Sequence, residues 1–301
     1  MIINNEVYLA TIIAVASGIF GQYFIKKLAS LESISRALNV MFLICVGLAS
    51  AIVLFFGQGH WRVEIFIVGL GFINALVAWL WWRAIKVSLS QTMLFLPLTG
   101  FTGVFLTALL LGEGNFLNPK DLGGVLALLG ALGLLSSIYF FRGSRQEGKK
   151  VRRIWLWCII GQSILGGVIV FLMKYFALQE ISKTNFIFSW YLGAFLGSFM
   201  PLILEKDLKI RLPRKGLWPA YLLLSVATLV SVLTSYWSLE LAPAALVLPF
   251  QQFLNVLSSA LVGLFIFHER KSFSFLDWIG VAVGFTSMVL LIVGISLVAK
   301  I

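Results

Sequence analysis

The side chains in this 301-residue sequence that could hold a small solute are amides set deep in apolar stretches. They are Asn74, Gln162, Gln251, Gln252 and Asn255, with Gln22 at a shallower position in its stretch. An amide offers two N–H donors and one carbonyl acceptor, so it can bind amino-acid or hydroxyl groups without fixing a net charge. Trp190 lies in a similar stretch and could form one wall of an aromatic site for a cation. These residue types predict a substrate-binding site rather than a reacting centre.

The same residues also have a structural interpretation. Amides join transmembrane helices through hydrogen bonds of about 1 kcal/mol without touching a solute. Gln251, Gln252 and Asn255 favour the binding role, because three amides about one helical turn apart exceed what helix association needs. Four further aromatic residues come late in their stretches and are expected at headgroup level, where such rings collect: Trp81, Trp82, Tyr236 and Trp237.

Groups suited to covalent or metal chemistry lie elsewhere. His60 and His268 fall at the ends of apolar stretches, and Cys45 and Cys158 lie alone inside two of them. No spacing of these residues suits zinc, so we expect no metal, no cofactor and no catalytic residue. Every Asp and Glu lies at or beyond the edge of a stretch, which argues against proton-coupled export through a buried carboxylate.

The elements that carry the amides are membrane spans. The sequence is 60% hydrophobic and 12% charged, with a mean hydropathy of +1.00. Ten stretches lack Asp, Glu, Lys and Arg, and about 20 apolar residues suffice to cross roughly 30 Å of hydrocarbon as a helix. They are 7–25, 37–59, 65–82, 87–112, 122–141, 154–173, 184–204, 216–239, 241–267 and 278–299. We expect an all-α integral membrane protein with ten transmembrane helices, multi-pass in the cell membrane and in a prokaryotic inner membrane.

Two prolines interrupt long stretches. Pro97 and Pro249 lie inside the fourth and ninth, and proline removes one helical hydrogen bond and permits a bend. Each proline could therefore mark either a hinge that moves during transport or a fixed kink, and the sequence is compatible with both.

The distribution of positive charge predicts topology. Of the 23 Lys and Arg residues, 18 lie in the odd-numbered loops and five on the other side, which includes both termini. Cytoplasmic loops carry the excess of Lys and Arg, so this rule places both termini outside the cytoplasm. The net charge of +11 is thereby explained by topology, and no nucleic-acid partner is expected.

The chain also repeats itself. Residues 111–124 and 267–280 align at an offset of 156, and residues 17–29 and 165–177 at an offset of 148. The matched pairs are Glu113 with Glu269, Asp121 with Asp277, Gly124 with Gly280, Gly18 with Gly166 and Lys26 with Lys174. Asp121 and Asp277 are expected to cap the helices that follow them. A basic linker, 142–153, separates two five-helix halves, 1–141 and 154–301. Because five is odd, the halves enter the membrane from opposite sides, as inverted repeats do.

These features resemble a known family. Residues 96–113 read LPLTGFTGVFLTALLLGE, with Pro97 sixteen residues before Glu113, and the next stretch begins Asp-Leu-Gly-Gly. The sequence resembles the drug/metabolite transporter superfamily, its EamA-like permeases in particular. The resemblance implies ten helices in two repeats and both termini in the cytoplasm, opposite to the charge rule. The second half departs from the pattern, because Phe253 replaces the proline and His268 the glycine.

Together these observations predict a secondary transporter for a small neutral or zwitterionic metabolite, resembling an amino acid, with membrane lipid and substrate as its partners. The alternatives are an anionic or cationic metabolite, with Lys26 and Lys174 near the mouths for an anion, or a lipid-handling membrane protein. An intramembrane enzyme would require a buried acid pair, a Ser/His arrangement or a metal site. The sequence predicts none of these, so we expect no enzymatic activity.

Overall fold

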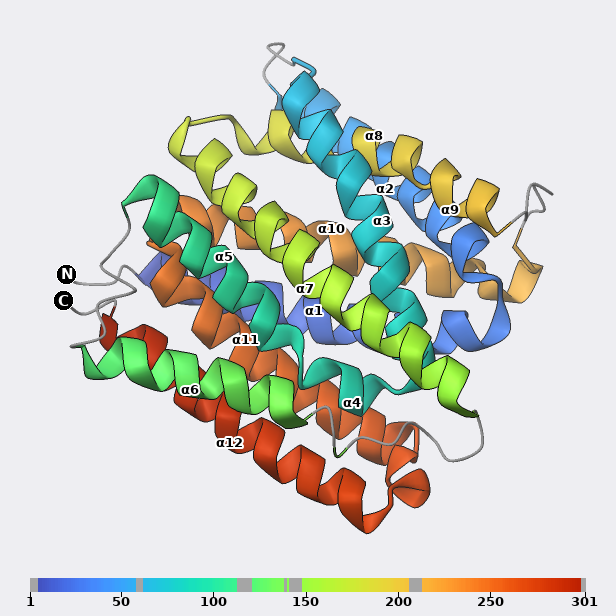
Figure 1. Ribbon diagram of the computed structural model, residues 1–301. Coiled ribbons are helices and arrows are strands. Elements are labelled where there is room, and N and C mark those ends of the chain that lie inside the picture. Colours follow the sequence, from blue (N-terminus) through green and yellow to red (C-terminus); the bar gives the residue numbers. More distant parts are fainter. Residues whose placement is uncertain are drawn as a thin grey trace.

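The structure is a computed structural model that describes residues 5–57, 62–112, 121–137, 140, 148–205 and 213–298. Within these ranges all regular structure is helical (Figure 1). The long helices are α1 (Asn5–Leu31), α2 (Ile34–Phe56), α3 (Ile65–Val87), α5 (Leu96–Leu111), α6 (Leu122–Ser137), α7 (Gly148–Leu178), α8 (Lys183–Gly197), α10 (Trp218–Leu241), α11 (Ala244–Leu261) and α12 (Phe275–Val298). The short ones are α4 (Leu89–Met93), α9 (Phe199–Leu204), the 3-10 turns η1 (Lys215–Leu217) and η3 (Glu269–Ser272), and the π-helical turn η2 (Val262–Ile266). Glu113 and residues 142–147 lie outside the described residues, and α7 begins within the predicted linker.

Nine of the ten predicted spans are confirmed by length and hydropathy among the described residues. Three are composite: α4 with α5, α8 with α9, and α11 with η2. The fifth predicted span appears as a shorter apolar helix, Leu122–Leu134 within α6. The protein is therefore a multi-pass helical membrane protein.

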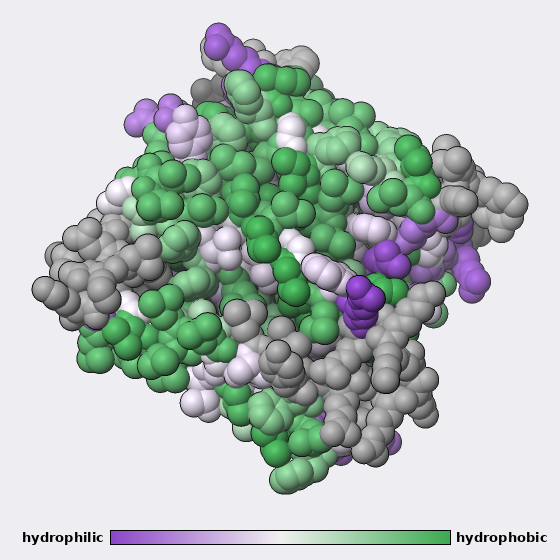
Figure 2. Space-filling model, in the orientation of Figure 1, coloured by the Kyte–Doolittle hydropathy of each residue, from purple (hydrophilic) through white to green (hydrophobic). Residues whose placement is uncertain are grey.

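The outer surface of the bundle is apolar, as a lipid-facing surface must be. Phe55, Phe66 and Phe275 are about four-fifths exposed, at 81%, 79% and 80%. Figure 2 shows a face covered mainly by hydrophobic residues, with hydrophilic residues gathered chiefly toward its margins. An apolar surface this extensive would be a liability in water and is stabilised by acyl chains.

Proline decides where two of the composite spans break. Pro97 has no N–H to donate to the carbonyl of Met93, and its ring crowds that carbonyl, so α4 ends at Met93 and α5 begins at Leu96. The same reasoning applies to Pro201, which lies four residues after the last residue of α8, Gly197. By contrast, α11 runs without interruption through Pro249.

The predicted capping role of the two aspartates is confirmed. Ser274, which precedes α12, donates its backbone N–H and its hydroxyl to the Asp277 carboxylate, each at 2.7 Å, and the N–H of Asp277 donates to Ser274 Oγ at 3.3 Å. This reciprocal arrangement is a capping box. Asp121 accepts a hydrogen bond from the N–H of Gly123 at 3.1 Å at the start of α6.

The helices pack so that α1, α3, α7 and α10 surround the centre of the bundle. The most extensive contacts join α6 to α12, α1 to α10, α3 to α8 and α5 to α7. In Figure 1, α6 and α12 lie together along one edge of the molecule, away from α2, α8 and α9. This arrangement brings side chains from both halves of the chain to one central site.

Candidate functional site

A cavity of about 230 Å³ lies at the centre of the bundle, and we name it the central cavity. Residues of α1, α2, α3, α5, α7 and α10 line it, and none of the lining side chains is ionisable. Its polar groups are hydroxyls and amides: Ser17, Gln22, Asn74, Gln162, Thr228 and Ser231. It is smaller than the roughly 300 Å³ at which sites for drug-sized ligands begin, so its size suits a small solute.

Three of the predicted binding residues meet in this cavity, from three different helices. Gln22 accepts a hydrogen bond from Trp81 Nε1 at 3.3 Å, and Gln162 accepts one from Thr99 Oγ1 at 3.2 Å. The side-chain amide of Asn74 forms no hydrogen bond to another residue that the structure describes, and Asn74 lines the cavity. The cavity therefore presents unused donors and acceptors, which a solute can satisfy.

Asn255 lies beside the cavity rather than in its lining. A Cβ atom built on Gly18, which lines the cavity, would stand 3.1 Å from Asn255 Oδ1 and 3.5 Å from Ser231 Oγ. The glycine thus allows the amide of α11 to approach the backbone of α1 closely, against the cavity wall.

The structure places Gln251 and Gln252 at contacts between helices. Gln251 Nε2 donates to Ser238 Oγ of α10 at 3.0 Å. With its amide oriented to satisfy both groups, Gln252 donates to Leu96 O and accepts from the Gly100 N–H, each at 3.0 Å. These groups border Pro97, so Gln252 ties α11 to the broken fourth span. The three amides of α11 therefore lie in three different environments, although they are within about one helical turn of one another.

Aromatic residues depart from the sequence-based interpretation. Trp190 is 2% exposed, packs on Phe186 at 5.5 Å between ring centroids, and is not part of the cavity lining. Trp81 and Trp82, expected at headgroup level, are buried and line the cavity instead. The prediction for these two was wrong because Arg83 ends the uncharged stretch but not the helix, which continues to Val87.

Tyr236, also expected at headgroup level, is fully buried. Its hydroxyl donates to the carbonyls of Phe176 and Ile181, at 3.1 and 3.0 Å, and its ring stacks on Phe186 at 3.8 Å. The prediction of a surface anchor was wrong here too, since the hydroxyl finds protein partners at the end of α7.

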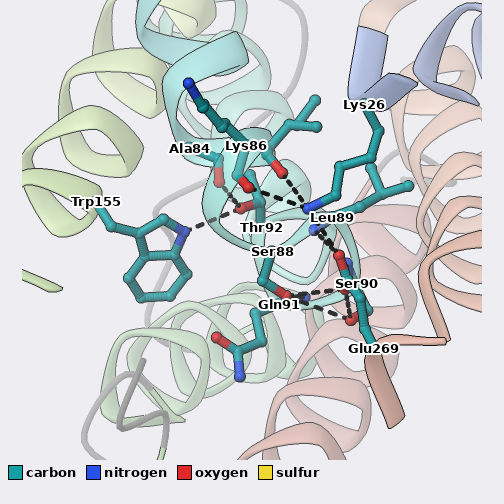
Figure 3. A network of polar contacts seen from close by, with 11 residues as sticks. Lys26, Ala84, Lys86, Ser88, Leu89, Ser90, Gln91, Thr92, Trp155 and Glu269 are labelled. Atoms are coloured by element: carbon teal, nitrogen blue, oxygen red, sulfur yellow. Dashed lines mark hydrogen bonds and ion pairs between the residues drawn. The ribbon is translucent and has the colours of Figure 1, made fainter. Parts of the chain in front are cut away.

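The expectation that no acid is buried is also wrong. The Glu269 side chain is 10% exposed and forms an ion pair with Lys26 at 3.0 Å (Figure 3). The same carboxylate accepts hydrogen bonds from the N–H groups of Leu89 and Ser90, at 2.8 and 2.9 Å, from Ser88 Oγ at 3.0 Å, and from Ser90 Oγ. Its position at the edge of a stretch concealed this burial, because all of its partners are remote in sequence.

Lys26 extends this network to the end of α3. Its ammonium donates to the carbonyls of Ile85 and Lys86, at 2.9 and 3.1 Å, while it holds Glu269 (Figure 3). The carboxylate in turn satisfies backbone N–H groups at the start of α4 that no helical carbonyl can reach. One ion pair thus fastens α1, α3, α4 and η3 together, one helical turn beyond the cavity residue Gln22.

The charge state of Glu269 follows from these contacts. Burial alone would raise the pKa of its carboxyl, but the Lys26 ammonium and the hydrogen bonds from Ser90 and Leu89 together hold the pKa below its ordinary value. The group therefore stays ionised at neutral pH and is suited to a fixed structural charge rather than to carrying a proton in this conformation.

This shift predicts a pH dependence of stability. A carboxyl whose pKa is lower in the folded state contributes stability above its unfolded value of about 4.3, and that contribution is lost as pH falls through the folded-state pKa. We expect the apparent melting temperature of the native protein to fall more steeply than that of Glu269→Gln as pH is lowered below about 4.5. Parallel melting curves of the two proteins through that range would contradict the assignment.

No group of three or more His, Cys, Asp or Glu among the described residues is arranged to hold a metal ion. What the central cavity offers is hydrogen bonding from amides and hydroxyls, with aromatic and aliphatic walls.

Comparison with known proteins adds information on the fold. No protein-family profile matches the sequence, and no curated protein is significantly similar to it. Nineteen chains of solved structures are similar to this one. One of them, titled "Crystal structure of protein", has a TM-score of 0.62 at 15% sequence identity, over 97% of this chain and 97% of that chain. The chain is thus a multi-pass helical membrane protein that shares its fold, over nearly its whole length, with a protein of known structure.

Proposed function

We propose that this protein is a secondary transporter that moves a small neutral or zwitterionic metabolite, resembling an amino acid, across the membrane by alternating access. The observation that carries the proposal is the central cavity, which collects uncharged polar groups from α1 and α3 in the first half and from α7 and α10 in the second. A midplane site between the two halves of a membrane protein is where such transporters bind their substrates.

The pattern of helix contacts supports an inverted repeat. Exchanging the halves relates α1 to α7, α2 to α8, α3 to α10, α5 to α11 and α6 to α12. Under this exchange the α1–α10 contact becomes α7–α3, α5–α7 becomes α11–α1, and α3–α8 becomes α10–α2, and all six contacts are present. The contacts of α6 with α12 and of α2 with α8 map onto themselves. A two-fold relation between the halves accounts for this correspondence.

Two lysines support the same relation. Lys174 occupies the position in the second half that Lys26 occupies in the first. Lys174 donates to the carbonyls of Leu239 and Ala242 at the end of α10, at 2.8 and 3.1 Å, as Lys26 does at the end of α3. Both ammonium groups donate hydrogen bonds to backbone carbonyls of the protein. This favours a neutral or zwitterionic substrate over an anion bound by the two lysines. We also propose, on the sequence motifs, membership of the EamA-like drug/metabolite transporters.

A thermal-stability screen of the purified protein tests the function. The ligands are amino acids, sugars, nucleotides, phosphorylated metabolites and quaternary amines, since a ligand that binds only the folded form raises apparent stability. We expect a shift confined to amino-acid-like compounds and lost in Asn74→Ala and Gln162→Ala. Gln179→Ala, an exposed amide at the end of α7, is the matched control and should keep the shift. A monodisperse sample that responds to no class, or a shift that survives both cavity substitutions, contradicts the proposal.

A further inference from the structure

A second cavity, of about 460 Å³, lies at the end of the bundle that carries most of the Lys and Arg residues, and we name it the outer cavity. Three charged side chains line it: Arg83 and Lys86 from α3, and Glu205 at the end of α9. Its apolar wall comes from α2 and α7, chiefly Ile34, Ile154 and Trp155.

The outer cavity and the central cavity lie in series along the same three helices, α2, α3 and α7. On α2 the outer cavity is lined by Ile34 and the central one by Met41, and on α7 the corresponding residues are Trp155 and Gln162. Each step is seven residues, or about 10 Å at 1.5 Å per residue. The outer cavity is therefore the next hollow that a solute would meet between the central cavity and this end of the protein.

Buried side chains separate the two cavities, which share no lining residue. Leu38 on α2 and Cys158 on α7 lie between the lining residues of the two cavities and are 0% and 3% exposed, and Trp82 of the central cavity, 1% exposed, directly precedes Arg83 of the outer one. The outer cavity is thus separate from the central cavity in this conformation, and a solute bound in one does not contact the lining residues of the other.

The charges of the outer cavity are held apart from one another. The Arg83 guanidinium lies over the Trp79 ring, 4.7 Å from its centroid, and Trp79 Nε1 donates to the Glu205 carboxylate at 2.8 Å. Within the part of the chain that the structure describes, neither Arg83 nor Lys86 forms an ion pair with Glu205 or with another carboxylate. Trp79 therefore acts as a spacer that keeps a guanidinium and a carboxylate available in one cavity.

We propose that the outer cavity is a vestibule site for a zwitterionic, amino-acid-like solute on its way to or from the central cavity. Arg83 and Lys86 bind the carboxylate of the solute, since a guanidinium matches carboxylate geometry with two parallel hydrogen bonds. Glu205 accepts hydrogen bonds from the ammonium group, and Trp155 and Ile154 contact the side chain. This inference rests on the proposed function and specifies the charge pattern of its substrate.

Protection of an introduced cysteine tests the vestibule. Ile154→Cys, at a cavity position that is 40% exposed, is placed in a Cys45→Ala, Cys158→Ala background and labelled with a maleimide. The probes are the L-amino acids, each compared with its amide, which lacks the negative charge, and its N-acetyl form, which lacks the positive one. We expect one or more zwitterions to slow labelling, by about tenfold at ten times Kd, and both derivatives to have no effect.

Substitutions in the same background identify the groups responsible. Arg83→Gln and Glu205→Gln should each abolish protection, whereas Lys27→Gln, an exposed lysine outside the cavity, should retain it. Protection by no zwitterion, equal protection by the N-acetyl form, or protection by anionic phospholipid alone would each overturn the proposal. If amino-acid-like compounds give the thermal shift that Asn74→Ala abolishes but do not protect Ile154→Cys from labelling, the vestibule site is refuted and the proposed transport function is not. Protection without that thermal shift would instead refute the central site.

Discussion

Glu269→Gln is expected to destabilise the protein by about 3–5 kcal/mol, the usual cost of removing one partner from a buried ion pair. The substitution leaves Lys26, whose side chain is 14% exposed, with two carbonyls and no counter-charge. It also replaces a carboxylate that serves the N–H groups of Leu89 and Ser90 by an amide whose NH₂ group cannot accept from them. Equilibrium unfolding of the detergent-solubilised protein measures this loss.

An exposed ion pair elsewhere in the molecule provides the control. Lys183 and Glu240 approach to 2.7 Å, but their side chains are 40% and 37% exposed, so Glu240→Gln should cost less than about 1 kcal/mol. Lys26→Met should be nearly as damaging as Glu269→Gln, and the double variant should lose less than the sum of the two. Additive losses, or equal effects at Glu269 and Glu240, would show that the buried pair has no special energetic role.

Gly71→Ala is expected to destabilise by about 1–3 kcal/mol, toward the upper end, because the new methyl group meets backbone rather than a side chain that can rotate away. A Cβ at Gly71 would collide with the carbonyl oxygen of Trp190 and lie 3.0 Å from the N–H nitrogen of Ala194. The crossing is reciprocal, since a Cβ at Gly193 would collide with the carbonyl oxygen of Val68. Gly193→Ala should therefore resemble Gly71→Ala, as both force α3 and α8 apart.

Gly69→Ala is the matched control on the same helix, two residues away. No atom lies within 4 Å of a Cβ built there, so alanine meets nothing and lowers the entropy of the unfolded chain. We expect a gain of about 0.5–1 kcal/mol, the usual difference between alanine and glycine in a helix interior. Changes of the same sign at Gly69 and Gly71 would contradict the close approach of the two backbones.

Several features of the site could be predicted from local sequence. The uncharged stretches locate the spans because burial in hydrocarbon is decided by apolar length, a property of consecutive residues. Asn74 and Gln162, deep in their stretches, and Gln22, at a shallower position, could be named as candidates because a polar group within such a stretch requires a polar partner. Asp277 could be predicted as a cap, since Ser274 and the helix start adjoin it.

Other features depended on which face of a helix meets which neighbour. Gln251 and Gln252 are adjacent, yet one bonds to α10 and the other to the broken fourth span, and nothing in their own stretch distinguishes them. Pro97 and Pro249 are both inside spans, but Pro97 follows a break in the helix, whereas α11 continues through Pro249. A proline in a sequence shows that a hydrogen bond is missing, and the surrounding helices decide whether the chain bends there.

By itself, then, the sequence determined that the chain is a helical membrane protein, where its spans lie, and which uncharged polar groups lie deep within them. Only the tertiary structure decided that Gln22, Asn74 and Gln162 share one cavity, that Trp81 and Trp82 line it, and that Glu269 is buried against Lys26. Span positions follow from the transfer of consecutive residues into hydrocarbon, which is additive along the chain. The cavity and the ion pair instead depend on contacts between residues as far apart as Lys26 and Glu269, and the packing of all the helices is needed to bring such residues together.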